Sequence, residues 1–247
     1  GTATMDTMWR RGISWARQAI EAVVATDKEE EQRFRGVVVS SGCYGAALAN
    51  GAEYTGDYQT QTIQDLITFH RRKIGSIPSS SSNKDNASVI GAIAIETIPS
   101  LMECQALRDL FCQLKGKALP ACWISLACRN GQELNDGTPV VEALRILDEI
   151  PLDAVQAVGF NCCAAQHLPA LLDTYMRHYY PPTTEDPIST ATKCRRPALV
   201  LYPNSGEELD ARAYDWISVT VCCTNAVDMA VQLLACIRHV DRYATSS

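Results

Sequence analysis

Short apolar runs alternate with longer amphipathic stretches along most of this chain. The apolar runs predict six strands, which span residues 37–40, 92–96, 123–126, 155–160, 198–201 and 217–221. The amphipathic stretches predict helices over residues 5–25, 62–73, 100–115, 140–149, 165–178 and 226–239. This alternation predicts a parallel sheet covered by helices. The strands are apolar throughout, as expected where both faces of a sheet are buried.

Two polar segments, residues 78–86 and 181–196, predict surface loops. The first contains four consecutive serines and the second contains several prolines, which do not fit a helix interior. Each segment falls where a helix returns to the next strand, so neither needs to mark a domain boundary. We therefore expect one α/β domain over residues 1–247.

Composition argues against two classes of partner. The chain has 22 basic and 28 acidic residues, a formal net charge of −6 and no basic run, which disfavours nucleic acid binding. Apolar runs such as residues 89–95 are far shorter than the ~18 residues that span a membrane. The N-terminus lacks the apolar core of a signal peptide. We expect a soluble, cytoplasmic protein.

The chain has 11 cysteines, an odd number that cannot all pair within one molecule. No C-x-x-C spacing occurs, which argues against zinc fingers and thioredoxin-like motifs. Reduced, buried thiols are the expected state of most of them. We expect this of Cys43, Cys104, Cys112, Cys122, Cys128, Cys194 and Cys236.

Chemically useful side chains gather at the C-terminal ends of the predicted strands. Glu96 ends one strand, Ser125 lies in another, and Asn161 and Cys162 end a third. In barrels and in open parallel sheets this edge carries the ligand. No G-x-G-x-x-G follows the first strand, so a dinucleotide site has little support.

Three cysteines at strand ends predict a metal site. Cys162 ends one strand, and the adjacent pair Cys222 and Cys223 follows the last one. Three thiolates can hold a zinc ion and leave its fourth position open, as catalytic zinc sites do. Such a centre suits the binding and activation of another thiol. Cys163 should point to the opposite side of its strand, and we expect it to be structural.

The chain carries six further motifs, which in order are GAALANGAEYTGDY at residues 45–58, ETIP at 96–99, WIS at 123–125 with DGTP at 136–139, GFNC at 159–162, YPNSGE at 202–207 and VCCT at 221–224. Together these motifs resemble those of homocysteine S-methyltransferases. The matches run from about residue 8 to residue 234, which is nearly all of the chain.

The resemblance implies a (β/α)8 TIM-type barrel with zinc bound by Cys162, Cys222 and Cys223 at its C-terminal face. It also implies methyl transfer from a sulfonium donor, S-methylmethionine or S-adenosylmethionine, to the thiolate of homocysteine, which gives methionine. Related branches use betaine or methylfolate. This chain contains no attached cobalamin or folate module, which favours the sulfonium donor.

Three residues are candidates for substrate binding. Glu96 suits the ammonium group of the substrate through charge-assisted hydrogen bonds. Asn161 and Ser125 suit the orientation of the substrate or of the ligand cysteines. Two of them have a plainer alternative: Glu96 serves only the N-terminus of the helix that follows, and Ser125 is only packed.

The chain departs from the family pattern at both ends. The family opens with a strand carrying Asp-Gly-Gly, a helix and a second strand, whereas residues 1–25 resemble the next helix, so about six of eight strands are expected. Only residues 203–216 separate the last two strands, which requires a short helix near residues 207–214. The alternative function is therefore a non-catalytic remnant, whose open sheet edges favour self-association.

Overall fold

Five parallel strands form the main sheet of this computed structural model, which describes residues 2–26, 36–78, 90–117, 119–181 and 196–204 and the backbone of 208–210 and 215–217. The strands are β1 (Val37–Gly42), β2 (Ile90–Ile98), β3 (Ala121–Leu126), β4 (Ala157–Ala164) and β5 (Ala198–Asn204). They lie in sequential order, and every neighbouring pair is parallel.

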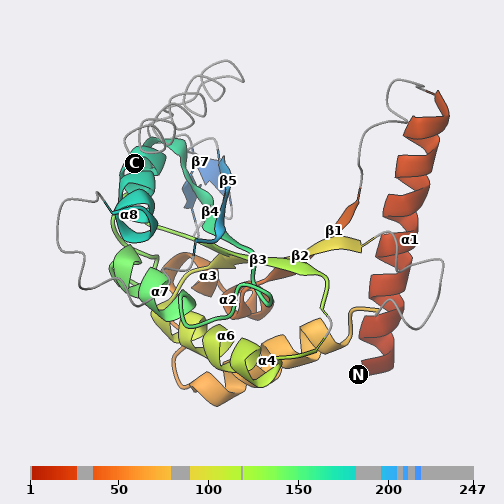
Figure 1. Cartoon of the computed structure of the whole chain (residues 1–247), viewed down its shortest axis with the longest axis horizontal. Coiled ribbons are helices and arrows are strands. Elements are labelled where there is room, and N and C mark those ends of the chain that lie inside the picture. The colour runs from red at the N-terminus through yellow and green to blue at the C-terminus, as the bar shows by residue number, and fades with distance from the viewer. Residues whose placement is uncertain are drawn as a thin grey trace.

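Helices cover one side of this curved sheet (Figure 1). The long ones are α1 (Thr2–Thr26), α4 (Ile63–Gly75), α6 (Leu101–Gln113), α7 (Val140–Leu147) and α8 (Leu168–Tyr179), the last preceded by a 3-10 turn, η2 (Ala165–His167). Helices α4, α6, α7 and α8 follow the outside of the curve, and α1 stands beside β1. None of the helices in the described ranges is long and apolar enough to cross a membrane.

This arrangement distinguishes a barrel-type sheet from a doubly wound one. A doubly wound sheet reverses its strand order at a switch point and carries helices on both faces. The present order runs from β1 to β5 without reversal. The predicted α/β class and barrel-type topology are therefore confirmed for five strands, and the sheet is not closed within the described residues.

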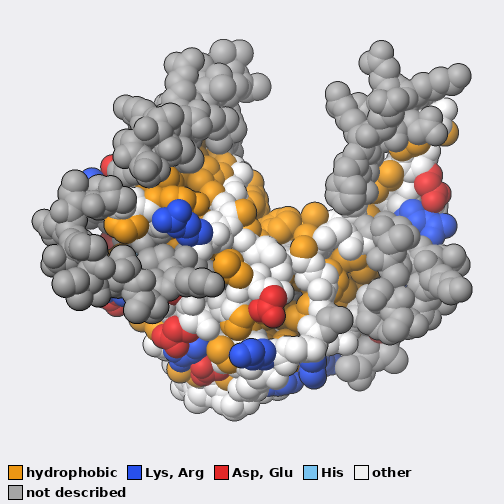
Figure 2. Space-filling view, in the orientation of Figure 1, with side chains coloured by type: hydrophobic (Ala, Val, Ile, Leu, Met, Phe, Trp, Pro, Cys, Tyr) orange, Lys and Arg blue, Asp and Glu red, His pale blue; other side chains and the backbone are white. Residues whose placement is uncertain are grey.

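The core lies between the outer face of the sheet and the helices. Strand side chains such as Ile95, Ile124 and Phe160 are fully buried, as are Leu107 of α6 and Leu144 of α7. On the visible face, charged side chains lie mostly over α4, α6 and α7, while hydrophobic side chains gather in the hollow on the inner side of the sheet (Figure 2).

Local signals explain where the helices begin. Thr62 and Asp65 form a reciprocal capping box at the start of α4. The Ser100 hydroxyl accepts the backbone N–H of Glu103 and caps α6. Two short helices, α2 (Tyr44–Leu48) and α3 (Ala52–Thr55), were not predicted, because four or five residues are too few to show a helical period.

The C-terminal region departs from the expectation. The prediction of a short helix near residues 207–214 is wrong at residues 208–210. These residues form the strand β6 (Glu208–Asp210), which pairs antiparallel with β7 (Asp215–Ile217). Pairing with a strand a few residues away satisfies the backbone groups of both locally. The rest of the predicted strand at 217–221 and the helix at 226–239 lie outside the described residues.

Candidate functional site

The carboxyl ends of β2 and β4 are both irregular. The pairing register of β2 with β3 shifts between Ile95 and Ile98, and that of β4 with β5 shifts between Asn161 and Ala164. Thr97 and Cys162, within these two irregular segments, have φ angles of 64° and 50°. Positive φ is uncommon for residues other than glycine, and bulges often re-aim side chains beside functional sites.

The Asn161 side chain ties the two irregular segments together. Its Oδ1 accepts the backbone N–H of Thr97 at 2.9 Å, and its Nδ2 donates to Thr97 Oγ1 at 2.8 Å. The same Nδ2 donates to Cys162 Sγ at 3.2 Å, and Thr97 Oγ1 donates to that sulfur at 3.6 Å. Asn161 is almost fully buried, whereas Cys162 is exposed. The arrangement therefore presents an oriented thiol at the carboxyl edge of the sheet.

A second polar group surrounds the Glu96 carboxylate. Tyr202 donates its hydroxyl to Glu96 Oε2 at 2.9 Å, and the Ser40 hydroxyl donates to Oε1. The Tyr202 oxygen also accepts Trp123 Nε1 at 3.1 Å and lies 2.6 Å from Ser125 Oγ. Burial raises the pKa of Tyr202 to about 12, so its hydroxyl keeps the proton that it donates.

These contacts bear on the alternative in which Glu96 serves only the N-terminus of the following helix. The N-terminus of α6 is bonded to other side chains. The Ser100 hydroxyl accepts the backbone N–H of Glu103, and Asp136 Oδ2 accepts the Leu101 N–H at 2.8 Å. The helix-partner alternative for Glu96 is therefore wrong. The carboxylate is partly buried and oriented by hydroxyl donors, an arrangement that suits a cation. Ser125 is fully buried, so it is packed and also bonded to the Tyr202 hydroxyl.

The two adjacent cysteines of β4 differ as expected. Cys163 is 2% exposed and packs in the core, and burial raises the pKa of its thiol to about 12. Cys162 instead faces the carboxyl edge, where two donors contact its sulfur. Donors aimed at sulfur suit a thiolate ligand, so this residue fits one position of the predicted zinc site.

The other two predicted ligands, Cys222 and Cys223, lie outside the described residues. Within the described ranges, no group of three or more His, Cys, Asp or Glu side chains gathers into a metal site. Of the cysteines expected to be buried, Cys43, Cys104, Cys122 and Cys128 are buried and Cys112 is exposed, while Cys194 and Cys236 lie outside the described residues. Cys112 lies near the end of α6, where its sulfur contacts the backbone oxygen of Glu149 at 3.8 Å.

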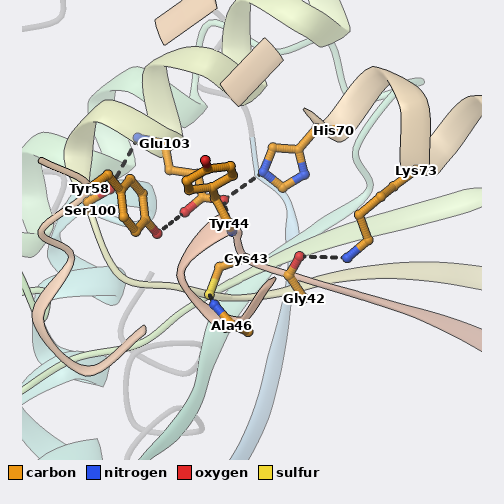
Figure 3. Close-up of polar contacts among 9 residues, drawn as sticks. All are labelled: Gly42, Cys43, Tyr44, Ala46, Tyr58, His70, Lys73, Ser100 and Glu103. Atoms are coloured by element: carbon orange, nitrogen blue, oxygen red, sulfur yellow. Dashed lines mark hydrogen bonds and ion pairs between the residues drawn. The ribbon is translucent and has the colours of Figure 1, made fainter. Parts of the chain in front are cut away.

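The segment that follows β1 is held by a buried carboxylate, Glu103, which was not predicted from the sequence. Glu103 of α6 is fully buried, accepts the Tyr44 N–H at 2.8 Å and the Tyr58 hydroxyl, and lies 2.7 Å from His70 Nε2 (Figure 3). Burial, followed by the charge of Glu103, raises the pKa of Tyr58. The cluster therefore fixes the segment between β1 and α4 onto the helices beneath it.

The turn after β1 is held at a second point. Lys73 of α4 donates to the backbone oxygen of Gly42 at 2.9 Å, and burial lowers its pKa (Figure 3). Between these anchors, the Cys43 sulfur accepts the Ala46 N–H and caps α2. Burial raises the pKa of Cys43 to about 12, so this thiol is a neutral cap.

Tyr202 and Thr97 are site residues that the sequence reasoning did not identify. The strand predicted at residues 198–201 ended before Tyr202, yet this residue lies within β5 and bonds to Glu96. The available signal was their place in the motifs, since hydrogen-bond partners on other strands leave no local pattern.

Comparison with known proteins gives one consistent family. A family model described as homocysteine S-methyltransferase matches residues 2–234. The chain is 31% identical over 216 residues to homocysteine S-methyltransferase 4 of Zea mays, and 31% identical over 228 residues to homocysteine S-methyltransferase YbgG of Bacillus subtilis. These matches cover 86% and 87% of this chain but 55% and 63% of the relatives. The chain thus spans about three fifths of their length.

Solved structures agree with the sequence matches. The oxidized form of the homocysteine methyltransferase MmuM from Escherichia coli superposes with a TM-score of 0.62 at 29% identity, over 87% of this chain and 62% of that one. Its metallated form gives a TM-score of 0.60 at 29% identity, over 83% and 60% of the two chains.

Proposed function

The chain belongs to the homocysteine S-methyltransferase family, and from this premise we propose that it transfers a methyl group to the thiolate of homocysteine, giving methionine. One observation carries the proposal. The exposed Cys162 thiol is contacted by Thr97, and the residue before Thr97 is the oriented carboxylate Glu96. A sulfur site beside an anionic site fits a substrate that has both a thiol and an ammonium group. The family match over residues 2–234 supports a single domain across residues 1–247.

In this proposal Glu96 binds the substrate ammonium group. The Tyr202 and Ser40 hydroxyls donate to its two oxygens and so fix the plane of the carboxylate. Ser125 acts through Tyr202, because it is fully buried beneath that hydroxyl. Asn161 acts through Thr97 and Cys162. Charge-assisted bonds of this kind give a carboxylate both affinity and direction.

We further propose that Cys162, Cys222 and Cys223 hold a zinc ion. Zinc held by three thiolates supplies an open coordination position at which a substrate thiol is deprotonated. The exposure of Cys162 and the two donors aimed at its sulfur support its part in this set. If Glu96 binds the ammonium group of the substrate, the substrate sulfur lies on the side of the site where Cys162 is.

The zinc proposal is tested by the metal content of single variants. Cys162→Ala, Cys222→Ala and Cys223→Ala should each lose most of the zinc after dialysis against a mild chelator, because two thiolates leave the site with too few fixed ligands. Cys163→Ala and Cys128→Ala are matched controls that keep the metal, since both thiols are buried. Loss of zinc in Cys163→Ala with retention in Cys162→Ala would contradict the assignment.

We propose a sulfonium donor, S-methylmethionine or S-adenosylmethionine. Purified, zinc-loaded protein is given homocysteine with each of these, with betaine or with methyltetrahydrofolate, and methionine is measured. The expected result is turnover with a sulfonium donor that is lost when the zinc is removed. A clear preference for betaine or methylfolate overturns the donor, and no turnover by folded, zinc-loaded protein overturns the activity.

One observation favours the second candidate, a non-catalytic member of the family. The five-stranded sheet is not closed within the described residues. A chain of this kind would bind homocysteine weakly or not at all and would give no methionine with any donor. The assay above, together with calorimetric titration of homocysteine, separates the two candidates.

A further inference from the structure

The hydrogen bonds around Asn161 are consistent with only one orientation of its side-chain amide. Thr97 donates its backbone N–H to Asn161, so the amide oxygen must face it and the amide nitrogen must face Thr97 Oγ1 and Cys162 Sγ. Thr97 Oγ1 accepts a hydrogen bond from the Asn161 amide nitrogen, so the proton of the Thr97 hydroxyl must point to another acceptor. That acceptor is the Cys162 sulfur, 3.6 Å from Thr97 Oγ1. The sulfur therefore receives two hydrogen bonds from donors that are themselves fixed.

The backbone of Thr97 makes this contact more informative. Its φ of 64° is a conformation that β-branched residues seldom adopt and that glycine adopts without cost. Thr97 is nevertheless held there by its own N–H and by its hydroxyl, both through Asn161. Backbone strain of this kind persists where the surroundings over-determine it, and it clusters at functional sites.

We propose that Thr97 is a positioning residue for metal binding: its hydroxyl, oriented by Asn161, holds the Cys162 thiolate in the direction required of a metal ligand. This inference rests on the proposed function, in which Cys162 binds zinc. Donors to a ligand sulfur fix its orientation before the metal arrives, and loss of such a partner weakens metal binding by about 10–100-fold.

The test compares Thr97→Val with Thr97→Ser. Valine keeps the branched shape and removes the hydroxyl, whereas serine keeps the hydroxyl and removes the methyl. Thr68→Val is the matched control, because Thr68 lies on α4 and its hydroxyl donates to the Gln64 backbone oxygen at 2.8 Å, away from the site. Zinc affinity is measured at fixed pH by competition with a chromophoric chelator, and the thiolate-to-metal absorption band is recorded with Co²⁺.

Thr97→Val should bind zinc about 10–100-fold more weakly than wild type, with a shifted Co²⁺ band, while Thr97→Ser and Thr68→Val keep wild-type affinity. Unchanged affinity in Thr97→Val, or an equal loss in Thr97→Ser, overturns the inference. Thermal unfolding of the metal-free proteins checks the fold, and Thr97→Ala replaces the valine variant if that one does not fold. Wild-type protein that binds no zinc overturns the proposed function itself, and with it the inference, so the two failures are distinguishable.

Discussion

The Tyr202 hydroxyl joins side chains from three strands at one oxygen atom. A phenol has one proton to donate, and Tyr202 donates it to Glu96, so Ser125 must donate to Tyr202 as Trp123 does. Since burial holds the pKa of Tyr202 near 12, this arrangement is stable at neutral pH. The orientation of the one carboxylate proposed to bind substrate thus depends on a residue 106 positions away in sequence.

Tyr202→Phe tests this dependence. The variant removes the donor to Glu96 and leaves the buried Ser125 hydroxyl without that acceptor, so homocysteine binding should weaken by about 1.5–3 kcal/mol, or roughly tenfold or more. The KM for homocysteine or its calorimetric Kd is the measurement. Tyr180→Phe is the control, because Tyr180 packs against Arg196 on the outside of the site. Equal affinities in wild type and Tyr202→Phe would contradict the role.

Position in a strand could be predicted from sequence, and contact between strands could not. Glu96, Asn161 and Cys162 were found because they follow apolar runs, and the structure places them at the carboxyl edge. Thr97 and Tyr202 act through partners 64 and 106 residues away in sequence, to which no local period points. The roles of Cys222 and Cys223 stay predictions.

At the scale of elements, β4 and β5 approach each other closely below the site. A Cβ added to Gly159 would lie 1.7 Å from the backbone oxygen of Val200, so any other residue there would push the two strands apart. Two residues farther along β4 is Asn161, and Tyr202 lies opposite it on β5. The glycine therefore sets the spacing that the site residues need.

Gly159→Ala should destabilise the protein by more than about 2 kcal/mol. The added Cβ would collide with the backbone of Val200, which cannot move aside as the end of a flexible side chain can. Gly12→Ala is the matched control: Gly12 lies within α1 with nothing within 4 Å of an added Cβ, and alanine there should stabilise the helix by about 0.5–1 kcal/mol. Urea unfolding gives both values. A Gly159→Ala variant as stable as wild type would show that β4 and β5 can separate.

Elements were predictable where local pattern decides them. Five strands and five long helices were expected within a few residues of their observed ends, because each has a full apolar run or an amphipathic period. The short helices α2 and α3 and the hairpin of β6 and β7 were missed. These elements are three to five residues long, so tertiary contacts rather than period determine them.

At the scale of the whole molecule, the sheet has two outer strands. Within the described ranges β1 pairs with β2 alone and β5 with β4 alone, and Val38 of β1 is 44% exposed. Unpaired strand edges invite pairing with another chain. Sedimentation velocity over a range of concentrations should show self-association, which Val38→Lys should reduce. Val23→Lys on α1, also half exposed, is the control, and a concentration-independent monomer would contradict the prediction.

Buried acids make the molecule sensitive to alkali. Burial raises the pKa of Cys43, Cys122 and Tyr202 to about 12, against about 8.5 for a free cysteine and about 10 for a free tyrosine. Above pH ~8.5 the unfolded chain releases protons that the folded chain keeps, so the free energy of unfolding should fall as pH rises toward about 12. Urea unfolding at several alkaline pH values measures this fall. The Cys122→Ala variant should show a shallower slope, and an equal slope would count against the role of that thiol.

The Asn161 side chain connects β2 to β4 across the end of the strand between them. A bond that skips one strand forms only if the sheet bends enough to bring its second neighbours together. Flattening the sheet would separate Thr97 from Asn161 while leaving every strand pair intact. The hydrogen bonds to the Cys162 sulfur therefore depend on the curvature of the sheet. A chain that kept its strands but relaxed its bend would lose the site while still resembling its relatives in secondary structure.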